Sequence, residues 1–200
     1  VYSDYQRDNS DQEIKDFINI LAGNFLIVLF CFTLVALLIA PVFILIFAPG
    51  FYFDDFKREI AVDILRIMFP YLGLISLVAF AGAIQNTHSR FSLPAFTPLL
   101  FNICLIFAAL IIAPNYDLPI YVLAWGVLIA GFVQLTIQLF PLKQINRLPV
   151  PKFNLNNHGT RRVIKLMIPA MLAGGIMQIN LLIDTIFASL LQTGSPTWLY

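Results

Sequence analysis

Long apolar runs alternate with short polar connections along the whole chain, and this pattern predicts an all-α protein. Five runs are each long enough to form a helix that crosses the roughly 30 Å hydrocarbon core of a bilayer. They cover about residues 17–47, 54–86, 93–113, 120–142 and 163–191. Five helices of this length and apolarity cannot all be buried inside a soluble globule of 200 residues. The pattern therefore predicts a polytopic integral membrane protein.

Local signals mark where several of these helices begin, bend and end. Ser10, followed three residues later by Glu13, has the spacing of a capping box at a helix start. Pro49 and Gly50 end the first run. Pro70 lies inside the second run and predicts a kink, which membrane helices tolerate when neighbouring groups satisfy the freed backbone.

The composition supports the membrane interpretation and excludes several classes of function. Hydrophobic residues make up 60% of the chain and charged residues 12%, which is too few for a wetted surface. The formal net charge of +1 offers no basic excess, so we expect no nucleic-acid partner. Cys31 and Cys104 lie in different apolar runs and are expected to be small buried hydrophobes.

The sequence gives no support for an enzyme. His88 and His158 fall in expected loops, far apart and outside any HExxH spacing. The chain has no GxSxG, P-loop or GxGxxG motif. We therefore expect neither catalytic activity nor an organic cofactor.

The distribution of lysine and arginine predicts the orientation in the membrane, because cytoplasmic loops are enriched in these residues. Nine of the twelve fall on the side where the chain starts, and three on the other. The larger group comprises Arg7, Lys15, Arg90, Lys143, Arg147, Lys152, Arg161, Arg162 and Lys165; the smaller group comprises Lys57, Arg58 and Arg66. The N-terminal end and the 143–160 connection should therefore face the cytoplasm.

Asp184 is the only charged residue well inside an apolar run, NLLIDTIFASLL. An ionisable group there costs a few kcal/mol unless it faces a partner or a cavity. Helical spacing places small and polar groups on its face, so we expect it to point into the bundle. That face comprises Ala173, Met177, Asn180, Asp184, Ala188 and Leu191. Three interpretations stay open: a structural aspartate bonded to an asparagine of a neighbouring helix, a cation or proton site, and a side chain that reaches the interface.

Uncharged polar residues in or beside the expected spans form a second group of interest. We expect most to make hydrogen bonds between helices and some to line a hydrophilic cavity. They are Asn19, Asn24, Asn102, Gln134, Gln138, Gln178 and Asn180.

Several segments together resemble the MurJ (MviN) family of lipid II flippases, in the family's order and over nearly the whole chain. They are FAPGF at 47–51, ILRIMFPYLGLIS at 64–76, AIQNTHSRFSLPAFTPLLFNI at 83–103, GVLIAGFVQLTIQLFPL at 126–142, RRVIKLMIPA at 161–170 and QINLLIDTIFASLLQTGSPTWLY at 178–200. The chain begins with Val1 and stops at Tyr200 directly after an apolar run, so we expect an internal segment of a longer protein.

The resemblance implies a MATE-like fold of fourteen transmembrane helices in two lobes around a central cavity, within the MOP superfamily. This chain would supply about the third to seventh helices. Residues 1–142 would finish the first lobe, 143–160 would form the cytoplasmic linker between lobes, and 161–200 would provide the first helix of the second lobe.

The resemblance also implies a function, namely flipping of lipid II across the bacterial inner membrane by alternating access. The arginines that grip its diphosphate would lie outside these residues. Some family members have a sodium site with an aspartate on the seventh helix, and Asp184 is the matching position, with Na⁺ or H⁺ as coupling ion. The expected partners are lipid II, membrane lipids and proteins of cell-wall synthesis.

Two alternatives remain at this stage. The first is an exporter of drugs, or of another polyprenyl-linked glycan, from the same superfamily. The second is a membrane scaffold that transports nothing and binds a protein of cell-wall synthesis. The arginine content of the flanking helices would separate a flippase from a drug exporter.

Overall fold

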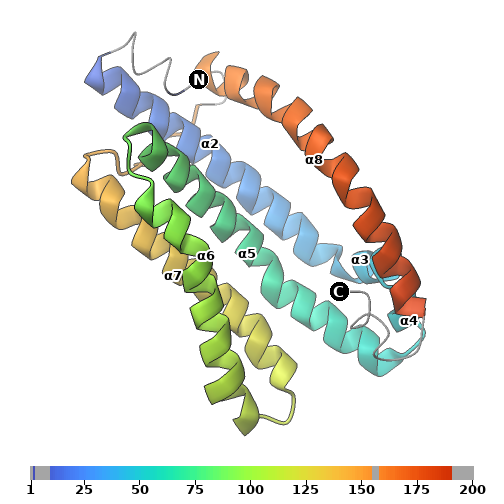
Figure 1. The fold of residues 1–200 in the computed structure, drawn as a ribbon. Coiled ribbons are helices and arrows are strands. Elements are labelled where there is room, and N and C mark those ends of the chain that lie inside the picture. Colours follow the sequence, from blue (N-terminus) through green and yellow to red (C-terminus); the bar gives the residue numbers. More distant parts are fainter. Residues whose placement is uncertain (1, 3–9, 155–157, 191–200) are drawn as a thin grey trace.

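A computed structural model shows a bundle of long helices and no strand within the residues it describes, which are 2, 10–154 and 158–190. A few helical side chains in these ranges, including that of Asp184, are outside the description. The elements in chain order are α2 (Asp11–Leu38), α3 (Ala40–Phe47), α4 (Pro49–Tyr52), α5 (Asp55–Thr87), α6 (Ser92–Phe107), the π-helical turn η1 (Ala108–Ile112), the 3-10 turn η2 (Ala113–Asn115), α7 (Pro119–Gln144) and α8 (His158–Leu190) (Figure 1).

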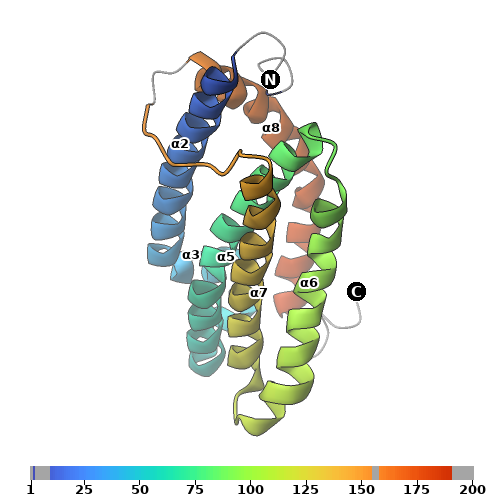
Figure 2. The ribbon, with the colours of Figure 1, turned by 90° about the vertical axis from the view of Figure 1, so that its left-hand side faces the viewer.

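Helix α5 lies at the centre of the bundle. Helices α6 and α7 pack together on one side of it, whereas α2 lies next to it and α8 runs on the far side (Figures 1 and 2). Two apolar clusters hold α5 in place. One joins it to α2 and α7 through Ile14, Ile18, Ala81, Ile84 and Leu142. The other joins it to α2 and α3 near their opposite end, through Ala36, Ala40, Ile44, Val62 and Phe69.

Four helices of the described part are long and apolar enough to cross a membrane. They cover Asp11–Leu38, Asp55–Thr87, Ser92–Asn115 and Pro119–Gln144. Large apolar side chains project from them, with Phe30, Leu38 and Leu110 each 70–72% exposed. Such a surface suits lipid and is foreign to a water-soluble monomer. The protein is therefore a multi-pass membrane protein, and the fifth expected span, 163–191, corresponds to α8.

The first helix begins earlier than expected and is interrupted. Ser10 caps α2: its hydroxyl accepts a hydrogen bond from the Glu13 amide and the Glu13 carboxylate accepts one from the Ser10 amide, which confirms the capping box. Where the apolar pattern predicts one helix over 17–47, the structure has two, with a break at Ile39. The break has a physical cause, because Pro41 in the first turn of α3 has no amide to continue the ladder of α2.

The second and third expected helices also differ in detail. α5 runs unbroken from Asp55 to Thr87 with Pro70 inside it. α6 ends at Phe107, and the chain continues through a π-helical and then a 3-10 turn as far as Asn115. Pro114, in that last turn, prevents the regular helix from continuing.

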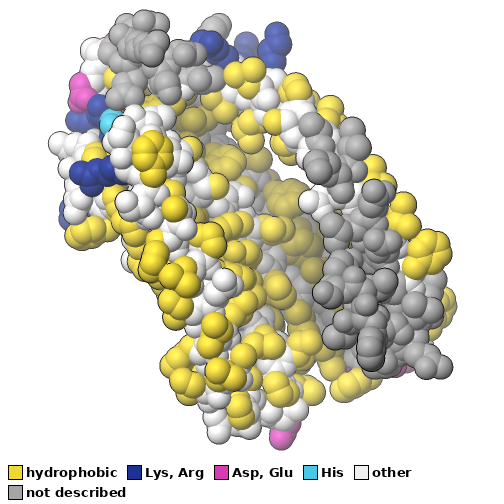
Figure 3. Space-filling model, viewed as in Figure 1, with side chains coloured by type: hydrophobic (Ala, Val, Ile, Leu, Met, Phe, Trp, Pro, Cys, Tyr) yellow, Lys and Arg dark blue, Asp and Glu magenta, His cyan; other side chains and the backbone are white. Residues whose placement is uncertain are grey.

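One end of the bundle, here called the basic end, is where α2 and α8 begin and where α5 and α7 end (Figure 1). Lys and Arg side chains gather there in the space-filling view, whereas apolar side chains cover the middle of the molecule (Figure 3). This arrangement brings together charges that are far apart in the sequence, as in the ion pair of Asp11 with Arg147.

Candidate functional site

The segment between α7 and α8, residues 145–154, crosses the outer face of α2 and is here called the strap (Figure 2). Its main chain is bound to Asn19 of α2 at two points. The Val150 amide donates to Oδ1 of Asn19 (2.8 Å), and the Lys152 amide donates to the main-chain oxygen of Asn19 (3.0 Å). The strap therefore has a defined register on the helix.

Asn24 fixes the far end of the strap. Its Oδ1 accepts a hydrogen bond from the Asn154 amide (3.1 Å), and its Nδ2 donates to the Asn154 carbonyl oxygen (2.7 Å). The same Nδ2 lies 3.3 Å from Oγ1 of Thr160, in the first turn of α8. Asn24 is 4% exposed and Thr160 2%, so this junction is closed to solvent. One side chain thus joins α2, the strap and the start of α8.

Gly23 makes the close approach of the strap possible. A Cβ atom at this position would lie 2.2 Å from the carbonyl oxygen of Lys152 and 2.9 Å from its nitrogen. Both are backbone atoms, so no side-chain rotation could relieve the overlap. Asn19, Gly23 and Asn24 together form what we call the docking site. It consists of two asparagines whose amide side chains bind the strap and, between them in the sequence, a glycine without a side chain.

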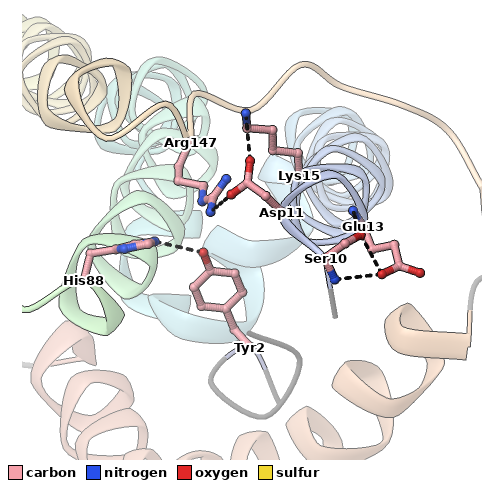
Figure 4. Close-up of polar contacts among 7 residues, drawn as sticks. All are labelled: Tyr2, Ser10, Asp11, Glu13, Lys15, His88 and Arg147. Carbon is pink, nitrogen blue, oxygen red and sulfur yellow. Dashed lines mark hydrogen bonds and ion pairs between the residues drawn. The ribbon is translucent and has the colours of Figure 1, made fainter. Parts of the chain in front are cut away.

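Ion pairs hold the two ends of the strap against α2. Arg147 donates to the carboxylate of Asp11, which also pairs with Lys15 at 3.1 Å (Figure 4). The hydrogen bond to Asp11 raises the pKa of Arg147 above its ordinary value, and the guanidinium stays charged although its side chain is only 10% exposed. Lys152 pairs with Asp16 at 2.6 Å in a more exposed setting.

A tyrosine–histidine contact lies beside this charge cluster. The hydroxyl of Tyr2 and Nε2 of His88 form a hydrogen bond of 3.0 Å (Figure 4). Burial lowers the pKa of His88, and the positive charges of Arg147 and Arg90 lower it further. The imidazole therefore remains neutral near pH 7.

A second polar group lies inside the bundle, where α5, α6 and α7 meet, and is here called the amide cluster: Gln85, Thr97, Gln134 and Gln138. Nε2 of Gln138 donates to Oγ1 of Thr97 (2.6 Å), and Nε2 of Gln85 donates to the side-chain and main-chain oxygens of Gln138. Nε2 of Gln134 donates to the main-chain oxygen of Thr97 (2.9 Å). All four residues are at most 5% exposed. Oε1 of Gln85 and of Gln134 accept no hydrogen bond from the part of the chain that the structure describes.

A groove of about 510 Å³ opens beside the amide cluster. Its polar lining consists of side-chain amides and hydroxyls without a charged group, so it can bind neutral donors and acceptors rather than an ion pair. The polar lining residues are Tyr71, Asn86, Thr97, Asn102, Gln134 and Gln138.

The structure tests the expectations for the polar residues one by one. Asn24, Gln134 and Gln138 do bond across helices. Within the described ranges, Asn19 bonds the strap and not another helix, Asn102 lines the groove, and Gln178 is exposed on α8. The side chains of Asp184 and Asn180 lie outside the described residues, so the suggested ion site stays a prediction. Among the described residues, no group of three histidine, cysteine or acidic side chains could hold a metal ion.

Sequence reasoning missed three residues of these sites. Gln85 falls at the end of an apolar run beside an expected loop, Thr97 lies between two prolines, and Gly23 has no side chain to draw attention. The sequence offers one signal, because Asn19 and Gly23 are four residues apart and so lie on one face of the helix, with Asn24 next to Gly23 in the chain.

Comparison with known proteins gives a consistent result. The family model described as "Lipid II flippase MurJ" matches residues 1–200. A protein named "Probable lipid II flippase MurJ" from Buchnera aphidicola (Acyrthosiphon pisum) is 41% identical over 200 residues, which cover 100% of this chain and 39% of that protein. Its counterpart in Haemophilus influenzae is 36% identical over 207 residues, 100% of this chain and 41% of that protein. The "Lipid II flippase MurJ" of Burkholderia cenocepacia is 40% identical over 156 residues, 76% of this chain and 30% of that protein.

The family model and the first two relatives match the whole chain, the third matches 76% of it, and the chain spans less than half the length of each relative. The matched segment contains the four membrane-length helices, the strap and the docking site. On this evidence the chain belongs to the MurJ family of lipid II flippases, which are transporters.

Proposed function

We propose that this chain is part of a flippase that moves lipid II from the inner to the outer leaflet of the bacterial cytoplasmic membrane by alternating access. The observation that carries the proposal is the family match over all 200 residues. The relatives that this chain resembles are named as lipid II flippases and are more than twice its length. The activity would therefore belong to the longer protein.

The basic end is proposed to face the cytoplasm, with the N-terminal end of the chain. This assignment rests on the bias of lysine and arginine to cytoplasmic loops. Of the eleven lysines and arginines that the structure describes, eight belong to the loops and helix ends of the basic end by the order of the helices. Arg90, Lys143 and Arg147 are among them.

The division into lobes is part of the same proposal. Residues 1–142 would complete the first lobe, 143–160 would link the lobes, and 161–200 would begin the second. The position of α8 supports this division, because it runs on the far side of α5 from α6 and α7 (Figures 1 and 2). The strap is the connection that carries the chain across.

Ion coupling through Asp184 is a further element of the proposal. It rests on the position of a single acidic residue in the apolar sequence of α8. Replacement of Asp184 by Ala in the full-length protein should abolish the sodium or proton dependence of transport while the protein stays folded. A coupling ion would have no role at this residue if the ion dependence were unchanged.

The proposed function is tested by depletion of the full-length protein in growing cells. Lipid II should then accumulate in the inner leaflet, where a hydrolase added outside the membrane cannot cleave it. Re-expression of the intact protein should restore cleavage. Normal cleavage during depletion would contradict lipid II flipping and favour a drug exporter, a transporter of another polyprenyl-linked glycan, or a membrane scaffold.

A further inference from the structure

The main chain of the strap is hydrogen-bonded to α2 at three successive points. Three of its main-chain amides, those of Val150, Lys152 and Asn154, donate to Asn19 or Asn24. The docking site accepts these bonds through one main-chain and two side-chain oxygens. A loop that only spans a distance needs no such pairing, because its amides can bind water.

The docking site also contacts the first turn of α8. Nδ2 of Asn24 donates to the Asn154 carbonyl oxygen and contacts Thr160, so the strap and the first turn of α8 share one anchor. Past this anchor, α8 presents apolar side chains to its surroundings: Leu166 is 58% exposed, Met171 67% and Ile179 53%. The start of α8 is therefore held by the docking site, whereas these three side chains beyond it project from the described part of the bundle.

These contacts would have to break together if the strap left α2. The space above Gly23 holds the main chain of Lys152. A shift of the strap by one residue along α2 would therefore break its hydrogen bonds to Asn19 and Asn24. The ion pairs Arg147–Asp11 and Lys152–Asp16 lie beside these hydrogen bonds and stabilise the same docked arrangement. Docking is therefore close to an all-or-none state.

We infer that the strap stays docked on α2 throughout the transport cycle, and that Asn24 is a positioning residue that keeps the start of α8 fixed while the lobes move. This inference rests on the proposed function, because it assigns the docking site a place in alternating access. It predicts that a covalent link between strap and α2 is compatible with transport.

The experiment uses the full-length protein with Asp16→Cys and Lys152→Cys, in a background where Cys31 and Cys104 are Ala. These two side chains form a 2.6 Å ion pair and are both partly exposed, so a short reducible bis-methanethiosulfonate can reach them. Lipid II flipping is measured in proteoliposomes before linking, after linking and after reduction. Each single-cysteine variant, treated with the same reagent, is the control for modification without a link.

The inference predicts that most molecules become linked and that the flipping rate stays within about twofold of the unlinked protein. A rate that falls about tenfold or more on linking and returns on reduction would show that the strap must leave α2. Failure to link would show that the strap is not docked in the membrane. Either result would overturn the inference. If even the unlinked protein failed to flip lipid II, the proposed function would fail, whereas the yield of linking would still report on docking.

A second variant separates positioning from a general structural role. Asn24→Ala removes the hydrogen bonds of this side chain to Asn154 and Thr160, and it should slow flipping by about tenfold. Linking the two cysteines in this variant should restore most of the rate, because the link replaces the anchor. If the alanine variant does not fold, Asn24→Asp replaces it in the same experiment. The aspartate keeps the hydrogen bond from the Asn154 amide and loses the donor to the Asn154 carbonyl oxygen. Absence of rescue in a folded variant would contradict the positioning role.

Discussion

Gly23→Ala tests the docking site with the smallest possible change, a single methyl group. The added Cβ would lie 2.2 Å from the Lys152 carbonyl oxygen, where ordinary contact begins near 3.4 Å. The strap must therefore retreat by about 1 Å, which takes the Lys152 amide beyond the 2.7–3.2 Å range of a hydrogen bond to Asn19. The neighbouring bond from Val150 shares the same register and is lost with it.

The expected magnitude follows from these two bonds. Each is worth about 1 kcal/mol, so docking is weakened by about 2 kcal/mol. That corresponds to a roughly 30-fold larger fraction of undocked strap. The higher helix propensity of alanine does not offset this effect, because α2 is helical whether the strap is docked or not.

Limited proteolysis of the full-length protein in detergent measures this equilibrium directly. A trypsin-like protease cuts after Arg147 and Lys152 only when the strap is released, and the cleavage rate follows the open population when opening is fast. Gly23→Ala should raise the rate by about 30-fold. Gly73→Ala is the matched control, since its Cβ would meet only Oγ1 of Thr33 at 3.6 Å. Equal cleavage of Gly23→Ala and the wild-type protein would refute the reasoning.

Three further predictions concern the amide cluster and the charges of the basic end. Gln138→Leu should lower stability by about 1–2 kcal/mol in a denaturant titration, because it removes the side-chain donor to Oγ1 of Thr97 and the side-chain acceptor of Gln85 inside the bundle. Thr97 and Gln85 would keep only their bonds to the main-chain oxygens of Leu93 and of residue 138. The exposed Thr136→Val should be neutral, and equal stabilities of the two variants would contradict the cluster's role. Arg147→Ala should lower the free energy of unfolding by about 1–2 kcal/mol, and Lys152→Ala by less than about 1 kcal/mol. The difference is expected because the Arg147 side chain is 10% exposed and that of Lys152 is 54% exposed. The reverse order in the same titration would refute this prediction. Because the pKa of His88 is lowered in the folded protein, the unfolded chain binds the proton first as the pH falls. Stability should therefore fall as the pH drops through about 6.5. The melting temperatures at about pH 7.5 and 5.5 should differ less in His88→Asn than in the wild-type protein.

Much of the helical framework could be predicted from the sequence, because apolar run length and capping act locally. The capping box at Ser10 and Glu13 and the four membrane-length helices follow from such local signals. The break at Ile39 also has a local signal, because Pro41 lacks the amide that an uninterrupted helix would need. The π-helical turn at 108–112 has no signal in residue type, since Ala, Leu and Ile are all compatible with a regular helix.

The sites were less predictable, because they depend on which segments meet. The amides Asn24, Gln134 and Gln138 were expected to bond between helices, and they do. Their partners could not be predicted, since Asn154 and Thr160 lie 130 and 136 residues from Asn24. The role of Gly23 exists only through the main chain of Lys152, which local sequence does not reveal.

The central claim is that the full-length protein moves lipid II between leaflets. The most direct measurement uses proteoliposomes with fluorescent lipid II in both leaflets and a quencher that cannot cross the membrane. With the protein present, quenching should proceed past the outer-leaflet half towards completion, while a fluorescent phospholipid in the same vesicles stays half protected. Lipid II that remains half protected in vesicles with folded protein and an imposed sodium or proton gradient of either direction would contradict the account.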